Sequence, residues 1–200
     1  ERYRLNYSIT EQVDKIKQIK NPIIRSCLEF LEIDERLYIA TISDIPASTG
    51  LGSSSTFCVG LLSGLYNFIG KKKSTYDLAE EAAHIEMNIL KRPIGKQDHF
   101  AAAYGGFNRF KFYKDKTHVS KINFEKNNLK ILEKNCLLFW TGIKRNASTI
   151  LNSQEKNIHK NINNLNKLKS YAEKLEIEFK KDTINLDNIA ELLDLNWNLK

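Results

Sequence analysis

The chain has 200 residues, of which 42% are hydrophobic, and a formal net charge of +7. This length suffices for one domain, or for one domain and part of another, and the hydrophobic content is ordinary for a globular protein. The positive charge is carried mostly by scattered lysines, without the signature of an RNA-binding domain or a DNA-reading helix pair, so we expect no nucleic-acid partner.

Signals for membrane insertion and secretion are also missing from the sequence. No segment reaches the roughly 18 uninterrupted apolar residues of a membrane span. The opening ERYRLNYSIT lacks the apolar centre of a signal peptide. Cys27, Cys58 and Cys136 are odd in number and widely spaced among apolar neighbours, which predicts reduced, packed thiols. We therefore expect a cytoplasmic protein with no membrane partner.

The first half of the chain predicts strands mixed with helices. Tyr3 and Leu5 alternate with polar residues as in a half-buried strand, and Ile24, Cys27 and Leu28 follow helical spacing. In chain order we expect a strand over 2–9, a helix over 22–31, a strand over 37–43, a helix over 54–69, a helix over 75–90 and a short helix over 98–104.

The second half predicts a hairpin from 108–113 and 118–124, a polar joint at 125–128, an apolar strand at 136–141, and helices over 146–180 and 186–199. Strands and helices follow one another without regular βαβ alternation. This order favours an α+β fold over a doubly wound sheet.

The segment DIPASTGLGSSSTF, residues 44–57, places glycines and serines directly before an expected helix. A helix N-terminus offers unpaired N–H groups and a partial positive charge, and glycines let a phosphate approach closely. Gly50, Gly52 and the serines 53–55 have this chemistry. An ordinary tight turn with a serine N-cap is the alternative that the local sequence leaves open.

Two acids stand out after this segment. Glu86 falls on one stripe of its expected helix with small and apolar residues, and a carboxylate buried there must be paired or coordinating. Asp98 follows a break at Pro93 and Gly95, where it is either an N-cap or a functional acid. Glu86 with a loop serine could hold Mg²⁺, Asp98 could orient or deprotonate an acceptor hydroxyl, and Lys96 could pair with Asp98 or a phosphate.

Two stretches resemble the GHMP kinases, the superfamily of galactose, homoserine, mevalonate and phosphomevalonate kinases. PASTGLGSSST (46–56) is similar to its signature PxxxGLGSS, and EEAAHIEMNILKRPIGKQDHFAAAYGGFN (80–108) to the region with its metal-binding glutamate and catalytic aspartate. Together with YRLNYSITEQVDKI and FWTGIKRNAS, the sequences of these stretches are most similar to those of the D-glycero-D-manno-heptose 7-phosphate kinases.

The resemblance implies a ribosomal protein S5 domain 2-like kinase domain over 1–127 and part of a ferredoxin-like C-terminal domain over 128–200. It implies that ATP phosphates are bound by Pro46, Gly50, Leu51, Gly52, Ser53, Ser54 and Ser55. Ser54 and Glu86 would bind Mg²⁺, and Asp98 would face the sugar hydroxyl. Arg92 and Lys96 are the candidates for the sugar phosphate.

The reaction so implied is ATP-dependent phosphorylation of the anomeric hydroxyl of a heptose 7-phosphate, with a homodimer left open. The family's first strands and its third glycine-rich motif have no counterpart here, so we expect the middle of a kinase whose activity belongs to a longer protein. Two alternatives stay open. One is another GHMP kinase, of the fucose or mevalonate-pathway type, and the other is a noncatalytic basic binding module.

Overall fold

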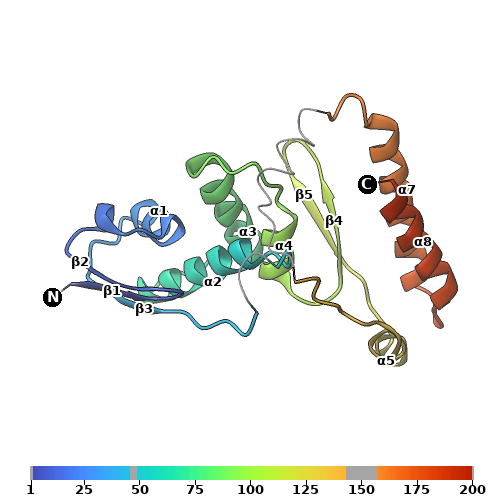
Figure 1. Ribbon diagram of the computed structural model, residues 1–200, viewed down its shortest axis with the longest axis horizontal. Coiled ribbons are helices and arrows are strands. Elements are labelled where there is room, and N and C mark those ends of the chain that lie inside the picture. Colours follow the sequence, from blue (N-terminus) through green and yellow to red (C-terminus); the bar gives the residue numbers. More distant parts are fainter. Residues whose placement is uncertain (1, 46–48, 143–156, 200) are drawn as a thin grey trace. The chain divides into compact units, whose positions relative to one another are not determined.

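The structure, a computed structural model, describes residues 2–45, 49–142 and 157–199. The described residues fall into two compact units (Figure 1). The first contains the residues up to Gly105 together with Gly142, and the second contains those from Gly106 to Thr141 and from 157 onward. In the described part of the chain, no helix is both long and apolar enough to cross a bilayer.

The first unit begins with a three-stranded sheet of order β2-β1-β3. Strand β1 (Tyr3–Asn6) pairs antiparallel with β2 (Thr10–Val13) and parallel with β3 (Tyr38–Ala40). The helices of this unit are a short 3₁₀ turn η1 (Ile16–Gln18) and α1 (Pro22–Phe30), which lie between β2 and β3 in the chain, and then α2 (Ser53–Phe68), α3 (Thr75–His84), a π-helical turn η2 (Ile85–Ile89) and α4 (Gln97–Tyr104).

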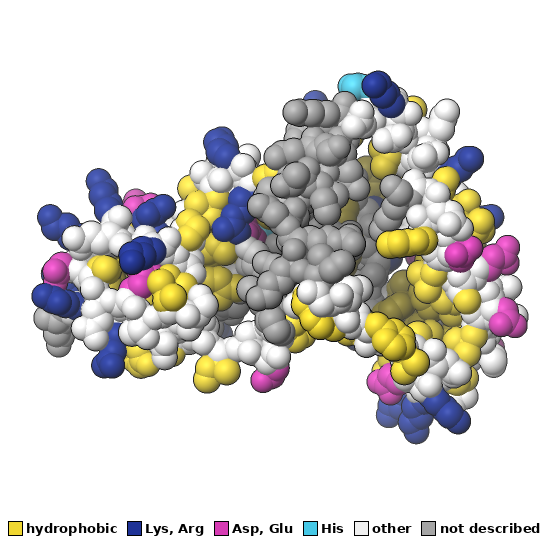
Figure 2. All heavy atoms as spheres, viewed as in Figure 1, with side chains coloured by type: hydrophobic (Ala, Val, Ile, Leu, Met, Phe, Trp, Pro, Cys, Tyr) yellow, Lys and Arg dark blue, Asp and Glu magenta, His cyan; other side chains and the backbone are white. Residues whose placement is uncertain are grey.

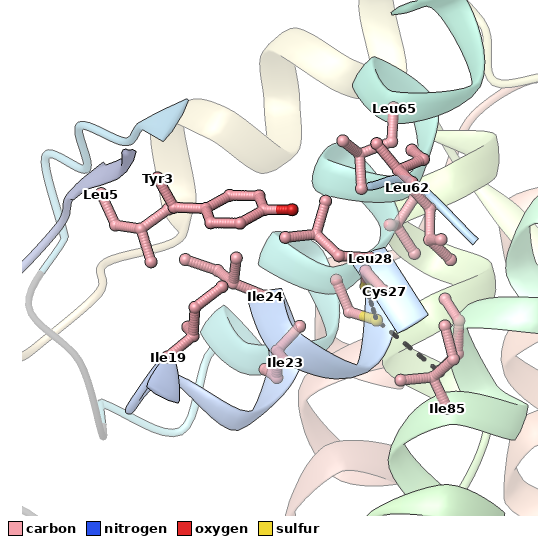
Figure 3. Packing of buried hydrophobic residues seen from close by; sticks show 14 residues of the cluster. Tyr3, Leu5, Ile19, Ile23, Ile24, Cys27, Leu28, Leu62, Leu65 and Ile85 are labelled. Atoms are coloured by element: carbon pink, nitrogen blue, oxygen red, sulfur yellow. Dashed lines mark hydrogen bonds between the residues drawn. The ribbon is translucent and has the colours of Figure 1, made fainter. Parts of the chain in front are cut away.

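The core of this unit lies between β1, α1 and α2. Tyr3 and Leu5, the inward residues of β1, point toward Ile24 and Leu28 of α1, with Leu62 of α2 beside them (Figure 3). Cys27 and Cys58 are buried with their sulfur atoms 4.0 Å apart, and both are free thiols. Two of the three packed thiols are thus confirmed. Cys136 is exposed, so its expected burial was wrong.

The second unit contains the hairpin of β4 (Asn108–Phe112) and β5 (Thr117–Lys121), then α5 (Lys126–Asn135), α7 (Ile162–Phe179) and α8 (Leu186–Asn198). The rings of Phe107, Phe124 and Phe179 pack together. The buried Asn128 donates to the backbone carbonyls of Lys181 and Asp182, and so joins α5 to the α7–α8 turn.

The α+β class is confirmed, and most expected elements of the first half are present. The sequence missed β2 and α5, because their polar residues carry little periodic signal. The strand expected at 136–141 was wrong, since Leu137, Leu138 and Phe139 are exposed and lie outside any strand or helix. Residues 146–156 of an expected helix lie outside the described residues, and α7 begins at Ile162.

Candidate active site

The glycine-serine segment places two left-handed glycines directly before α2. Gly50 has a φ of +83° and Gly52 a φ of +70°, a region that glycine enters without the strain other residues meet. Gly52 is the N-cap of α2, and no side chain caps the helix. The alternative of a serine-capped turn is therefore wrong. Ser53, Ser54 and Ser55 form the first turn of α2, Leu51 is exposed, and Pro46 lies outside the described residues.

Glu86 reaches this first turn from the π-helical segment after α3. Its side chain is fully buried, and the Ser54 hydroxyl donates to its Oε1 over 2.6 Å. A π-helical turn inserts an extra residue in a helix and often marks a functional position. Here Glu86 meets Ser54, a residue 32 positions earlier in the chain. The two residues proposed from sequence as metal ligands therefore lie in direct contact.

A second set of contacts keeps the Glu86 carboxylate charged. Burial by itself raises the pKa of this group, but hydrogen bonds from His99 and Ser54 outweigh that effect and lower the pKa of Glu86 to about 2. His99 Nε2 lies 2.9 Å from Oε2, and an Arg92 Nη1 atom contacts Oε1. The result is a buried carboxylate that stays ionised at neutral pH.

Asp98 lies against the loop glycine and is not the N-cap of its own helix. A Cβ atom at Gly52 would come within 2.9 Å of the Asp98 Cγ, so glycine is needed for this approach. The N-cap of α4 is Lys96, and Asp98 falls in the first turn. Asp98 is therefore no N-cap, and its exposed carboxylate lies beside the start of α2.

The two basic candidates have partners that the sequence did not predict. Lys96 Nζ lies 2.6 Å from Glu80 Oε2. The expected pairing of Lys96 with Asp98 was therefore wrong. The Arg92 Nη1 atom lies 2.5 Å from Ser54 Oγ and also contacts Glu86 Oε1. The structure thus brings Ser54, Glu86 and Arg92 to one point, while Lys96 is directed at α3.

His99 is the residue of this site that sequence reasoning missed. It is fully buried, and its ring contacts the carboxylate that the sequence singled out. The available signal was weak: His99 directly follows Asp98, so on a helix the two side chains point in different directions. From the sequence alone, a histidine at this position is indistinguishable from an ordinary core residue, because its contact with Glu86 is formed only in the folded protein.

Residues 18–106 match the family model described as the GHMP kinases N terminal domain. The chain is 29% identical over 193 residues to a D-glycero-alpha-D-manno-heptose 7-phosphate kinase of Campylobacter jejuni subsp. jejuni, covering 94% of the chain and 55% of the relative. It is 41% identical over 90 residues to a homoserine kinase of Clostridium beijerinckii, covering 44% of the chain and 27% of the relative. The chain thus spans about half the length of the first relative and about a quarter of the second.

Two solved structures are similar across 99% of the chain. A D-glycero-D-manno-heptose 1-phosphate kinase from Bacteriodes thetaiotaomicron superposes with a TM-score of 0.78 at 20% identity, with 63% of that chain covered. A mevalonate kinase superposes with a TM-score of 0.64 at 21% identity, with 65% of that chain covered. The chain therefore shares their fold.

Proposed function

We propose that the protein transfers the γ-phosphate of ATP to a small-molecule hydroxyl, on the premise of the match of residues 18–106 to the GHMP kinases N terminal domain. The acceptor we propose is the anomeric hydroxyl of a heptose 7-phosphate, and the compartment is the cytoplasm. Because the chain spans 55% of the heptose kinase it resembles, the activity is proposed for the protein that contains these residues. The boundary that we propose between the kinase and C-terminal domains is residue 127, which lies in the first turn of α5, whereas the compact units of the structure divide after Gly105.

One observation carries this proposal: the Asp98 carboxylate packs directly against Gly52, the residue before α2. The start of α2 has backbone N–H groups without a side-chain cap, which suits a phosphate group. An acid beside a phosphate-binding turn is what transfer to a hydroxyl requires. A turn that served only to join β3 to α2 would have no need of that acid.

The roles follow from these positions. The N–H groups at residues 52–55 and the serine hydroxyls would bind the phosphates of ATP. Asp98 would accept the proton of the acceptor hydroxyl as its oxygen bonds to the γ-phosphorus, while the bond from that phosphorus to the bridging oxygen breaks and ADP leaves. Arg92 and Lys96 remain the proposed contacts to the phosphate of the sugar. To bind it, Arg92 would have to leave Glu86, and Lys96 would have to leave Glu80.

The residues at the site fit a magnesium ion. Magnesium takes oxygen ligands, usually one or two carboxylates, and keeps several waters. Ser54 Oγ and Glu86 Oε1 supply a hydroxyl and an ionised carboxylate 2.6 Å apart. Among the described residues no group of three or more acids, histidines or cysteines could hold a metal, which excludes there a site built from many protein ligands. When bound, the ion would offset the negative charge on the transferred phosphate.

Acceptor profiling tests the proposal. The protein, with ATP and Mg²⁺, is offered heptose 7-phosphates, other sugar phosphates, homoserine and mevalonate, and ADP release is followed. We expect ADP formation that depends on a heptose 7-phosphate, with the new phosphate on the anomeric carbon. Turnover with homoserine alone would favour a second candidate, a homoserine kinase, because the 90-residue match at 41% identity points to that branch. Turnover with no acceptor of the panel would contradict the proposal.

A further inference from the structure

His99 is buried for a reason that ordinary core packing does not supply. Its side chain has no exposed surface, and its Nδ1 has no hydrogen-bond partner among the residues that the structure describes. A buried polar atom without a partner is unfavourable. The hydrogen bond of the ring within the described chain is the one to Glu86 Oε2, 2.9 Å from Nε2. An ionised carboxylate only accepts, so Nε2 carries the proton and donates.

The two oxygens of Glu86 therefore face different environments. Oε2 is directed into the protein, at His99, while Oε1 is directed at the first turn of α2, where it contacts Ser54 and Arg92. A donor that holds Oε2 fixes the rotation of the carboxylate plane, and this rotation decides where Oε1 points. Outer-shell donors orient metal-binding carboxylates in this manner.

His99 and Asp98 are also consecutive residues of the first turn of α4. Asp98 lies against Gly52 and His99 lies against Glu86. One helical turn thus sets the position of both acids relative to the start of α2. A residue that merely filled the core would not need a polar atom aimed at the carboxylate.

We propose that His99 is a positioning residue, whose Nε2–H holds Oε2 of Glu86 so that Oε1 stays directed at the start of α2 to take the divalent cation that accompanies the nucleotide. The inference rests on the proposed function. It adds a role for a buried residue whose hydrogen bond is to Glu86.

The test measures Mn²⁺ binding directly, by the electron paramagnetic resonance signal of free Mn²⁺ in the presence of the non-hydrolysable analogue adenylyl imidodiphosphate. We expect His99→Leu to weaken Mn²⁺ binding about 10–100-fold, as loss of an outer-shell donor does, and His99→Gln, whose amide reaches a similar point, to stay within about threefold of the unsubstituted protein. If His99→Leu does not fold, His99→Asn replaces it, because its shorter amide does not reach Oε2.

Phe100→Leu is the matched control. Phe100 is the next residue on α4 and is also fully buried, but its ring contacts Tyr76 and Tyr104. It should lower the melting temperature and leave Mn²⁺ affinity unchanged. Equal losses of Mn²⁺ affinity in Phe100→Leu and His99→Leu would mean a packing role and overturn the inference. Unchanged affinity in His99→Leu would also overturn it while leaving the proposed function intact. No Mn²⁺–nucleotide binding by the unsubstituted protein would overturn both.

Discussion

Glu86 in the first unit and Glu178 in the second are both buried, and the two glutamates differ in their partners. Glu178, in the second unit, accepts from the Asn185 backbone and the Lys181 side chain, both within seven residues of it. Glu86, in the first unit, is bonded to Ser54 and His99, which lie 32 and 13 residues away, and also to the nearer Arg92. Both carboxyls have pKa values below the ordinary range. Burial and a lowered pKa therefore do not by themselves mark a site.

The difference lies in what the partners are attached to. The partners of Glu178 belong to the turn between α7 and α8, where they hold one helix end to the next. The partners of Glu86 are Ser54 at the start of α2, His99 in α4 and Arg92 between η2 and α4, and the start of α2 follows two glycines in left-handed conformation. We interpret the first cluster as structural and the second as functional.

The largest expected effect is on Asp98. Asp98→Asn removes the proposed proton acceptor and should lower kcat by about 10²–10⁴, the usual contribution of such a group. Its carboxylate is exposed, so the melting temperature should change little. Asp187→Asn is the control, because Asp187 is also an acid in the first turn of a helix, in the second unit. A kcat within about tenfold of the unsubstituted protein in Asp98→Asn would exclude the proposed role.

Exchanging Glu86 or Glu178 for glutamine separates the two clusters directly. Glu86→Gln should abolish Mg²⁺-dependent binding of ATP, measured by calorimetry, because it removes the anionic oxygen that faces Ser54. Glu178→Gln should leave that binding intact and lower the free energy of unfolding by about 1–3 kcal/mol, as hydrogen bonds to a charged group are lost. If Glu178→Gln impaired ATP binding as strongly, the contrast between the clusters would fail.

The two loop glycines offer a finer contrast. Alanine at either position meets an unfavourable left-handed conformation, which costs about 1–2 kcal/mol. A Cβ at Gly50 has open space, whereas a Cβ at Gly52 would collide with Asp98. Gly52→Ala should therefore lower kcat well beyond Gly50→Ala, while urea unfolding should show a loss of stability in both variants. Equal kcat values would mean that the approach of Asp98 to Gly52 has no role in turnover.

The smallest expected effect is on how the stability of the folded protein depends on pH in the acid range. The pKa of Glu86 falls from its ordinary 4.5 to about 2 in the folded protein, so the unfolded chain binds more protons in this range. The contribution of this group to stability is present above pH 4.5 and is lost as the pH falls toward 2. Glu86→Gln should flatten the decline of urea midpoints between pH 5 and pH 3, relative to the unsubstituted protein. An unaltered slope would contradict the lowered pKa.

The sequence predicted the parts of the site that depend on residue type and on spacing within a short segment of the chain. Gly52 and Ser54 at a helix start, and the two acids Glu86 and Asp98, all follow from spacing and residue type. It also paired Glu86 with a loop serine, but it did not supply the contacts that Arg92 and His99 make with Glu86. Arg92 meets Ser54 because the π-helical turn ends near the start of α2, and no periodicity in 80–95 encodes that meeting.

The second unit was predicted less well for a related reason. The apolar run at 136–141 has the composition of a strand, but a strand needs a partner to pair with, and Leu137 and Leu138 stay exposed here. On the face seen in Figure 2, hydrophobic side chains are exposed over both units, and many of them gather over the second. Composition alone does not state which apolar segments become buried.

The central claim, that the start of α2 binds a nucleotide, is tested most directly by backbone amide NMR during titration with Mg²⁺ and adenylyl imidodiphosphate. The account predicts saturable shifts for the amides of Gly52, Ser53, Ser54 and Ser55, and for Asp98, with no change around Glu178. Shifts confined to the second unit, or no saturable shift at these serines, would contradict it.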